Sequence, residues 1–287
     1  MKTSIYILTL LPLSLAVCGC KSDSKDTKIT RPDLPKEVRN VAEAIENESP
    51  SQFASAVTYP IERPYPLPDV KDSAEMVNYY TQMIDEPIKK AVKEKPDSLW
   101  QQEGWRGWTL ENGAYFWIDE GKIYDITYMS KKETQMRDSL QSLEISSLEP
   151  SLRKDWTPVA CIMDTVSGAI FRIDSKMDID PPVYRLAGYS SESDLSGTPS
   201  IILYGTLDLE GSMGNRYYRF SDDNGTTAEY TPDVSEDDEE PRIEIDRKGH
   251  SKRYYAKPSY WLDHVKRPHH GKPTHPNVDS MNIINIK

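Results

Sequence analysis

The chain has 287 residues, a length that predicts about two domains. Its 35 Lys and Arg residues and 46 Asp and Glu residues give a formal net charge of −11. We expect no nucleic-acid partner, because affinity for phosphates comes from Lys and Arg. Three Cys and five His leave little material for thiol or metal chemistry.

The first 19 residues have the layout of a secretory signal peptide, with Lys2 before an apolar run over residues 5–17. This run is shorter than the roughly 20 apolar residues that span a bilayer. The segment ends in VCGC (residues 17–20), which resembles a bacterial lipobox. The resemblance implies cleavage after Gly19, a diacylglyceryl thioether on Cys20 and acylation of the new amine. The alternative is an ordinary signal peptide that is cut nearby.

Lipidation would hold the protein on a membrane without a transmembrane helix, because two or more acyl chains give stable anchoring. Lys21 stands where an Asp would favour the inner membrane, so we expect an anchor in the outer membrane. Residues 22–26 (SDSKD) resemble the acidic-serine signal for surface export, so periplasmic and surface orientations both stay open. The polar segment 20–35 predicts a flexible tether.

Cys161 is the one thiol left once Cys18 leaves with the signal peptide and Cys20 is alkylated. It lies in the apolar run VACIM (residues 159–163), whereas a reactive thiol needs an accessible, electropositive setting. We therefore expect a buried, inert Cys161 and no disulfide.

Residues 36–150 have the pattern of an α+β domain with helices packed on a curved antiparallel sheet. The chain at residues 59–68 contains four prolines and must be extended or turned. Helical spacing of apolar residues begins at Lys36, Ser51 and Ser73, after Pro87, and again over residues 131–148. A period of two predicts strands at residues 106–110, 114–118 and 122–128, joined by Asn112-Gly113 and Glu120-Gly121.

Residues 155–234 are rich in short strands and predict a small all-β sandwich or partly open barrel. The acidic block SEDDEE (residues 235–240) predicts a solvated linker. The tail, residues 241–287, has ten Lys and Arg against four Asp and Glu, and it contains all five His. Its prolines predict a largely irregular segment, which could fold back on the acidic block or contact anionic lipid. The predicted strands are residues 156–163, 169–174, 183–189, 200–209, 216–221 and 228–232.

Several short motifs are similar to uncharacterised secreted bacterial proteins that carry an NTF2-like or cystatin-like α+β domain. The resemblance covers about 90 residues and implies a cone of helices on a curved sheet, with no assigned reaction. The sequence GSMGN (residues 211–215) resembles the second, all-β domain of the same proteins. The motifs are YP at 59–60, RPYPL at 63–67, GWRG at 104–107, NG at 112–113 and GKI at 121–123.

The sequence offers no recognisable catalytic set. No His occurs between Lys21 and Gly249, so the His of a Ser–His or Cys–His pair would have to come from the tail. Phosphate loops and dinucleotide fingerprints are absent from the sequence. We therefore expect no catalytic residues and no cofactor.

Oxygen-rich and imidazole-rich segments do not follow metal-site spacing either. The motifs at 178–180 and 222–224 resemble parts of calcium loops but lack their length and closing Glu, so we expect solvated turns, as at residues 119–120. The tail residues His264 and His269 and their neighbours lack a Cys partner and regular helical spacing. We expect no metal.

Aromatic residues cluster on the predicted hairpin sheet. Alternation puts Arg106 with Trp108 on one strand face, and Tyr115 with Trp117 on one face of the next. Such faces could line the mouth of a cone and bind a ligand, with Arg106 placed for an acid group. The alternative is that the aromatic rings fill the core under the helices.

Two functions follow from these observations. The first is a non-catalytic, lipid-anchored envelope protein that binds a ligand or another envelope protein, for example as an immunity or inhibitor protein. The second is an envelope hydrolase that uses carboxylates in an NTF2-like pocket, which requires an Asp or Glu with a raised pKa deep in that pocket.

Overall fold

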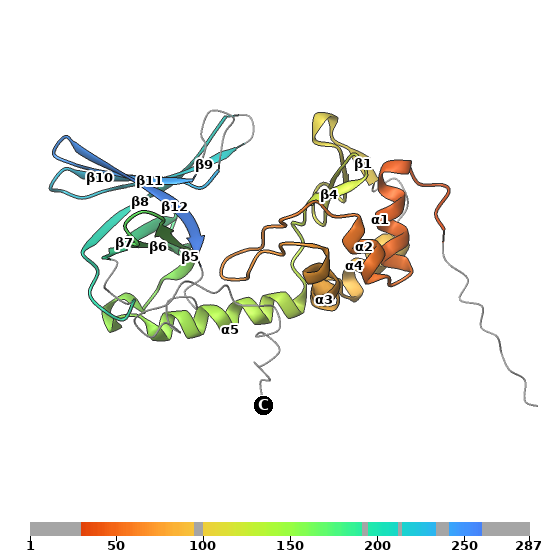
Figure 1. Ribbon diagram of the computed structural model, residues 1–287, viewed down its shortest axis with the longest axis horizontal. Helices are drawn as coiled ribbons and strands as arrows, with labels where there is room; N and C mark the ends of the chain where they lie inside the picture. Colours follow the sequence, from red (N-terminus) through yellow and green to blue (C-terminus); the bar gives the residue numbers. More distant parts are fainter. Residues whose placement is uncertain (1–29, 95–99, 191–194, 212–213, 234–240, 260–287) are drawn as a thin grey trace, which may run out of the picture.

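The computed structural model describes residues 30–94, 100–190, 195–211, 214–233 and 241–259 (Figure 1). They form an N-terminal lobe of helices with a small sheet and a C-terminal β-barrel, joined by one long helix. The expected signal peptide, Cys20, the acidic linker and the His residues beyond 259 lie outside these ranges. None of the helices in the described ranges is both long enough and apolar enough to cross a bilayer.

The N-terminal lobe begins with four helices whose positions were predicted from their apolar spacing. Pro50 occupies the first turn of its helix, where a missing N–H costs nothing. Asp72 caps the next helix by accepting hydrogen bonds from the backbone N–H groups of Ala74 and Glu75. The helices are α1 (Lys36–Glu46), α2 (Pro50–Ser55), α3 (Ser73–Met83) and α4 (Glu86–Glu94).

A small antiparallel sheet packs against these helices, so the predicted α+β class is confirmed. Its first strand, Trp100–Gln102, was not predicted. The three predicted strands are shorter than expected, because Arg106 lies in a 3₁₀ turn (Gly104–Arg106) and Tyr115 lies in the loop before the third strand. Glu120 and Gly121 both have positive φ, as a two-residue hairpin requires. The strands are β1 (Trp100–Gln102), β2 (Trp108–Leu110), β3 (Trp117–Asp119) and β4 (Lys122–Asp125).

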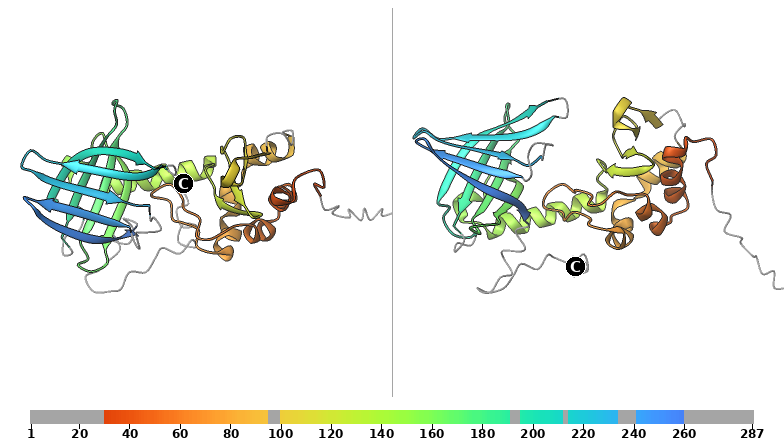
Figure 2. Two further views of the ribbon diagram at one scale, coloured as in Figure 1. Left: turned by 90° about the horizontal axis from the view of Figure 1, so that it is seen from above. Right: turned by 45° about the horizontal axis from the view of Figure 1, so that its top comes forward.

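Helix α5 (Lys131–Ser147) runs from the N-terminal lobe along the barrel, as two views show (Figure 2). It begins with a capping box: Ser130 Oγ accepts from the Glu133 N–H, and the Glu133 carboxylate accepts from the Ser130 N–H. A 3₁₀ turn, Pro150–Leu152, then leads into the first barrel strand.

The C-terminal lobe is a closed antiparallel barrel of eight strands within the described residues. Each strand pairs with the next in the chain, and the last strand pairs with the first to close the ring. The strands are β5 (Thr157–Asp164), β6 (Ile170–Lys176), β7 (Val183–Tyr189), β8 (Ile201–Glu210), β9 (Asn215–Ser221), β10 (Thr226–Thr231), β11 (Arg242–Arg247) and β12 (His250–Ser259).

This barrel corrects two predictions. Of the two expected forms, a sandwich and a partly open barrel, the structure has the barrel, but its ring is closed. The tail is regular over residues 242–259, where irregular structure was expected. Ile243 and Ile245 alternate with charged residues and are buried in the barrel, so the charges stay outside. Lys248 and Gly249 have positive φ and form the hairpin turn. The prediction missed this alternation because it considered the charge and the prolines of the segment as a whole.

The barrel interior is filled by apolar and tyrosine side chains, as expected for eight strands. A second cluster lies outside the barrel, where Leu148 at the end of α5 and Leu152 in the following 3₁₀ turn cover β5, β6 and β7. Cys161 belongs to this outer cluster, forms no disulfide within the described residues and is 2% exposed, which confirms the predicted buried Cys.

A buried network of four charged side chains lies between α5 and the barrel wall. Arg172 on β6 pairs with Glu144 of α5 and donates from Nε to Asp174 Oδ1 over 2.7 Å. Arg185 on β7 pairs with Asp174 at 2.6 Å and donates to the Leu152 carbonyl over 2.9 Å. All four side chains are at most 2% exposed. Their charges cancel, which makes burial tolerable.

Replacement of Arg172 by Ala would leave the buried Glu144 carboxylate without its cation, and Asp174 would keep Arg185 alone. We expect the free energy of unfolding to fall by about 3–5 kcal/mol, the usual cost of breaking one side of a buried ion pair. Urea denaturation followed by circular dichroism measures this change. The matched control is Arg219→Ala on β9, which removes a cation paired with Asp208 and Glu229 at the surface. Exposed pairs contribute about 0–1 kcal/mol, so equal losses in the two variants would contradict the role of the network.

Candidate functional site

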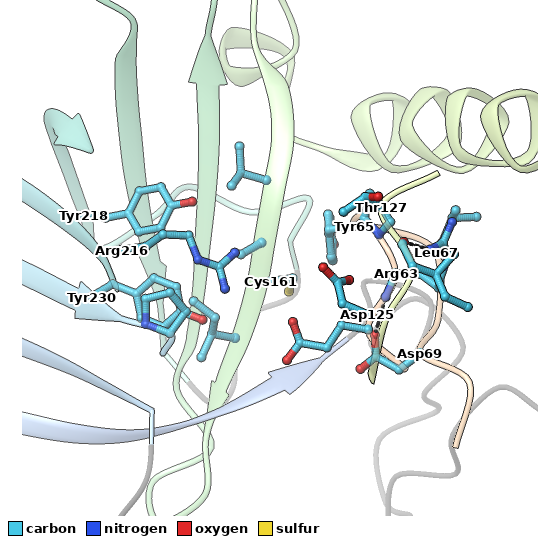
Figure 3. A pocket seen from close by; sticks show the side chains of 17 residues that line it. Arg63, Tyr65, Leu67, Asp69, Asp125, Thr127, Cys161, Arg216, Tyr218 and Tyr230 are labelled. Carbon is cyan, nitrogen blue, oxygen red and sulfur yellow. Dashed lines mark hydrogen bonds between the residues drawn. The ribbon is translucent and has the colours of Figure 1, made fainter. Parts of the chain in front are cut away.

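A cavity of about 450 Å³ lies between the N-terminal lobe and one end of the barrel. The proline-rich loop at residues 62–69 and the segment 125–127 after β4 form one side. Strands β5, β9 and β10 form the other side, and Figure 3 shows their side chains facing the N-terminal lobe across the cavity.

Arg63 fixes the proline-rich loop in place. Its Nε donates to Glu133 Oε1 over 2.9 Å, and its two terminal nitrogens donate to the carbonyls of Ile126 (2.5 Å) and Tyr128 (2.8 Å). The Arg63 and Glu133 side chains are fully buried. All three nitrogens of the buried guanidinium therefore hold the loop in place, so we assign Arg63 to the scaffold of the cavity and not to ligand binding.

Tyr65 ties the same loop to the barrel side of the molecule. Its hydroxyl donates to Glu144 Oε1 over 3.1 Å, and its ring packs against the cluster that contains Cys161. Because Glu144 also binds Arg172, the loop and the barrel wall share one carboxylate. The two sides of the cavity are thus held by one hydrogen-bond network.

Three carboxylates line the side that the N-terminal lobe provides. Burial raises the pKa of Glu62 above its usual value, the neighbouring Asp69 adds to this rise, and Arg216 opposes it. Burial also raises the pKa of Asp125. The hydrogen bond from the Ile126 N–H and the charge of Arg63 act in the opposite direction and lower it. Water still reaches Glu62 and Asp125, which are exposed at the rim and therefore partly screened. Burial is thus the main cause of both raised pKa values, and the three carboxylates bring negative charge to this side of the cavity.

The barrel side presents aromatic rings and one neutralised cation. The rings of Tyr218 and Tyr230 stack with centroids 5.8 Å apart, and both residues are buried. Arg216 donates to Asp233 from its backbone N–H (2.6 Å) and from Nε (3.1 Å). Its charge is thus balanced by Asp233. The cavity therefore sets three carboxylates opposite a tyrosine wall, an arrangement suited to a cationic group.

The residues predicted to bind a ligand lie elsewhere. Trp108 and Tyr115 pack against the N-terminal core, and the Tyr115 ring stacks on Tyr128 at 5.2 Å. Arg106 is exposed and lies 5.5 Å from the centroid of the Trp105 ring. Trp117 covers Gly113, where a Cβ would come within 2.7 Å of its ring. None of the four predicted residues lines the inter-lobe cavity, and their ligand-binding role stays a prediction.

Sequence reasoning missed the residues that form the cavity. Glu62 and Asp69 belong to a loop recognised by its prolines alone, and nothing in that pattern indicates what faces it. Tyr218 and Tyr230 follow the two-residue alternation of their strands, which places them inside the barrel without showing that they reach its end.

The acidic segments at residues 119–120 and 222–224 form turns, as the sequence predicted. Asp222 Oδ1 accepts hydrogen bonds from the N–H groups of Asn224 and Thr226, and Asp119 Oδ1 accepts from Glu120 N–H. Among the described residues, no group of three or more His, Cys, Asp or Glu is arranged to hold a metal ion.

Comparisons with known proteins give no relative: no family model, curated protein or solved structure matches the chain. The site must therefore be interpreted from its own chemistry.

Replacement of Glu62 by Gln should stabilise the fold in a pH-dependent way. A carboxyl with a raised pKa holds its proton longer in the folded than in the unfolded state, so stability falls as pH rises through the folded pKa. Glu62→Gln removes this loss. We expect the variant to equal the wild type below about pH 4, where the unfolded carboxyl is protonated, and to be more stable at pH 7.

Thermal unfolding across this pH range measures the effect. Glu120→Gln, at an exposed hairpin turn, is the control and should show no such difference. A Glu62→Gln advantage that stays constant from pH 4 to pH 7 would contradict the raised pKa.

Proposed function

We propose that this chain is a bacterial lipoprotein of the cell envelope, anchored through Cys20 in the outer membrane, and that it is a non-catalytic binding protein. The lipobox-like VCGC sequence after a short apolar run supports the anchor. The helices α1 to α4 against a curved antiparallel sheet support the NTF2-like resemblance of the N-terminal lobe, which we retain as part of this proposal.

The observation that carries the binding function is the pairing of three carboxylates with a tyrosine wall across one cavity. An amine or guanidinium between them would gain Coulomb attraction from Glu62, Asp69 and Asp125, and attraction to the ring faces opposite. A bound cation would also lower the raised pKa values of Glu62 and Asp125. The ligand class that fits is an organic cation, either a small molecule or a basic side chain of an envelope protein.

The same carboxylates define the alternative, an envelope hydrolase. A general acid would have to be kept from water so that it stays protonated at neutral pH. Glu62 and Asp125 are both exposed at the rim, whereas Asp69 is half-buried and accepts a hydrogen bond from the Arg63 N–H at 3.1 Å. We therefore place binding before catalysis.

The anchor is tested by Cys20→Ala in cells. We expect the protein to move from the membrane fraction to the soluble fraction, because the thioether and its acyl chains can no longer form. Cys18→Ala is the matched control, two residues earlier, and should leave the protein on the membrane. Cell fractionation with detection by immunoblot measures this change. A Cys20→Ala protein that stays in the membrane fraction would refute the anchor.

The cavity is tested with three small aromatic probes that differ in charge: benzylamine, benzyl alcohol and benzoate. We expect isothermal titration calorimetry to show binding of benzylamine, weaker binding of the alcohol and none of benzoate. The double variant Glu62→Gln/Asp125→Asn should bind benzylamine at least about tenfold more weakly, a loss of about 1.4 kcal/mol.

The control is Asp119→Asn/Glu120→Gln, which removes the same two charges from an exposed turn outside the cavity. Equal weakening in both double variants would show that general charge, and not the cavity, attracts the probe. Hydrolysis of an envelope glycan that is abolished in Glu62→Gln/Asp125→Asn would favour the alternative function.

A further inference from the structure

A second cavity, of about 460 Å³, lies at the other end of the barrel. It is lined by the end of β7, the start of β8 and the hairpin that joins β11 to β12. The first cavity is lined by the start of β9 and the end of β10. Because neighbouring strands are antiparallel, these two sets of strand ends belong to opposite ends of the barrel.

Two cations, Arg247 and Lys252, and the imidazole of His250 belong to this second cavity. Arg247 pairs in register with His250, and Ile245 pairs with Lys252. Residues in register share a face of the sheet, and Ile245 is buried in the barrel. Alternation along each strand then puts Arg247, His250 and Lys252 on that inner face, at the exposed rim of the cavity.

Acidic side chains are absent from the described lining of this cavity. Within the described part of the chain, none of the residues that line the cavity is Asp or Glu. The carboxylates of the two bordering hairpins are engaged elsewhere: Asp164 accepts from Tyr255 N–H (3.0 Å) and Asp246 accepts from Gly249 N–H (2.9 Å). The described lining of this cavity is therefore basic in a chain of net charge −11.

The floor of the cavity is apolar and aromatic. The Phe171 and Tyr254 rings meet edge to face with centroids 4.8 Å apart. Lys252 Nζ lies 4.6 Å from the centroid of the Tyr254 ring, so the rim cation is held directly above this floor. A ligand that satisfies the site needs an anionic group at the rim and an apolar body below it.

We propose that this end of the barrel binds an organic anion with an apolar body, such as a fatty or aromatic carboxylate or phosphate. Arg247, His250 and Lys252 hold the anionic group, and the body lies on Phe171, Tyr254 and Ile245. This site is separate from the inter-lobe cavity and does not depend on the function proposed there.

The test uses octanoate, octylammonium and inorganic phosphate, which separate the roles of charge and body. We expect calorimetry with the full soluble chain, made as Cys20→Ala without its signal peptide, to show binding of octanoate. Octylammonium lacks the right charge and inorganic phosphate lacks the apolar body, so each should bind at least tenfold more weakly.

Arg247→Gln/Lys252→Gln should weaken octanoate binding at least tenfold. The matched control is Arg253→Gln, the next residue on β12, which faces outward and pairs with Glu244 at 3.2 Å. Circular dichroism verifies that each variant is folded. Should the double variant fail to fold, Lys252→Met, which keeps the aliphatic stem, tests the same charge.

Three results would overturn the proposal. The first is octanoate binding that is equal in the wild type and in the charge variants. The second is octylammonium binding as tight as that of octanoate. The third is binding to vesicles of anionic lipid with no binding of octanoate, which would make the rim a membrane-contact surface.

Discussion

The structure depends on two buried Arg–Glu ion pairs along one face of α5. Glu133 and Glu144 are eleven positions apart, about three turns of helix, so both project to the same side. Arg63 from the proline-rich loop pairs with the first and Arg172 from the barrel pairs with the second. Each helix carboxylate therefore binds a different part of the chain, and α5 determines where the loop lies relative to the barrel.

The inter-lobe cavity follows from this arrangement. Tyr65 is two residues from Arg63 and reaches Glu144, so the loop is held at both Glu residues of α5. A loop fixed at two points cannot turn its remaining carboxylates away from the barrel without breaking a buried bond, which costs several kcal/mol. Glu62 therefore stays in a partly buried position at the cavity, and this burial raises its pKa. The fold tolerates unfavourable charge at this rim, and a cationic ligand would relieve it.

The sequence predicted the helices and most barrel strands, because their apolar periods are local properties. It could not predict which polar residues are buried. The helical pattern of α5 includes Leu143, yet Leu143 is 45% exposed and the adjacent Glu144 is buried. Glu144 is buried because it pairs with Arg172, which lies 28 residues later in the chain. The candidate sites were missed for the same reason, since both combine residues whose proximity arises only when the barrel closes.

The closed barrel also separates the two proposed sites. Its interior is filled by side chains such as Phe220, Leu203 and Ile243, so a ligand at one end cannot extend to the other. One end faces carboxylates and the other carries cations, so the two ends select ligands of opposite charge. Energetic coupling between them would require an element with two arrangements that both ligands bias. A filled, fully paired barrel resists such rearrangement, and the ends should therefore bind independently of each other.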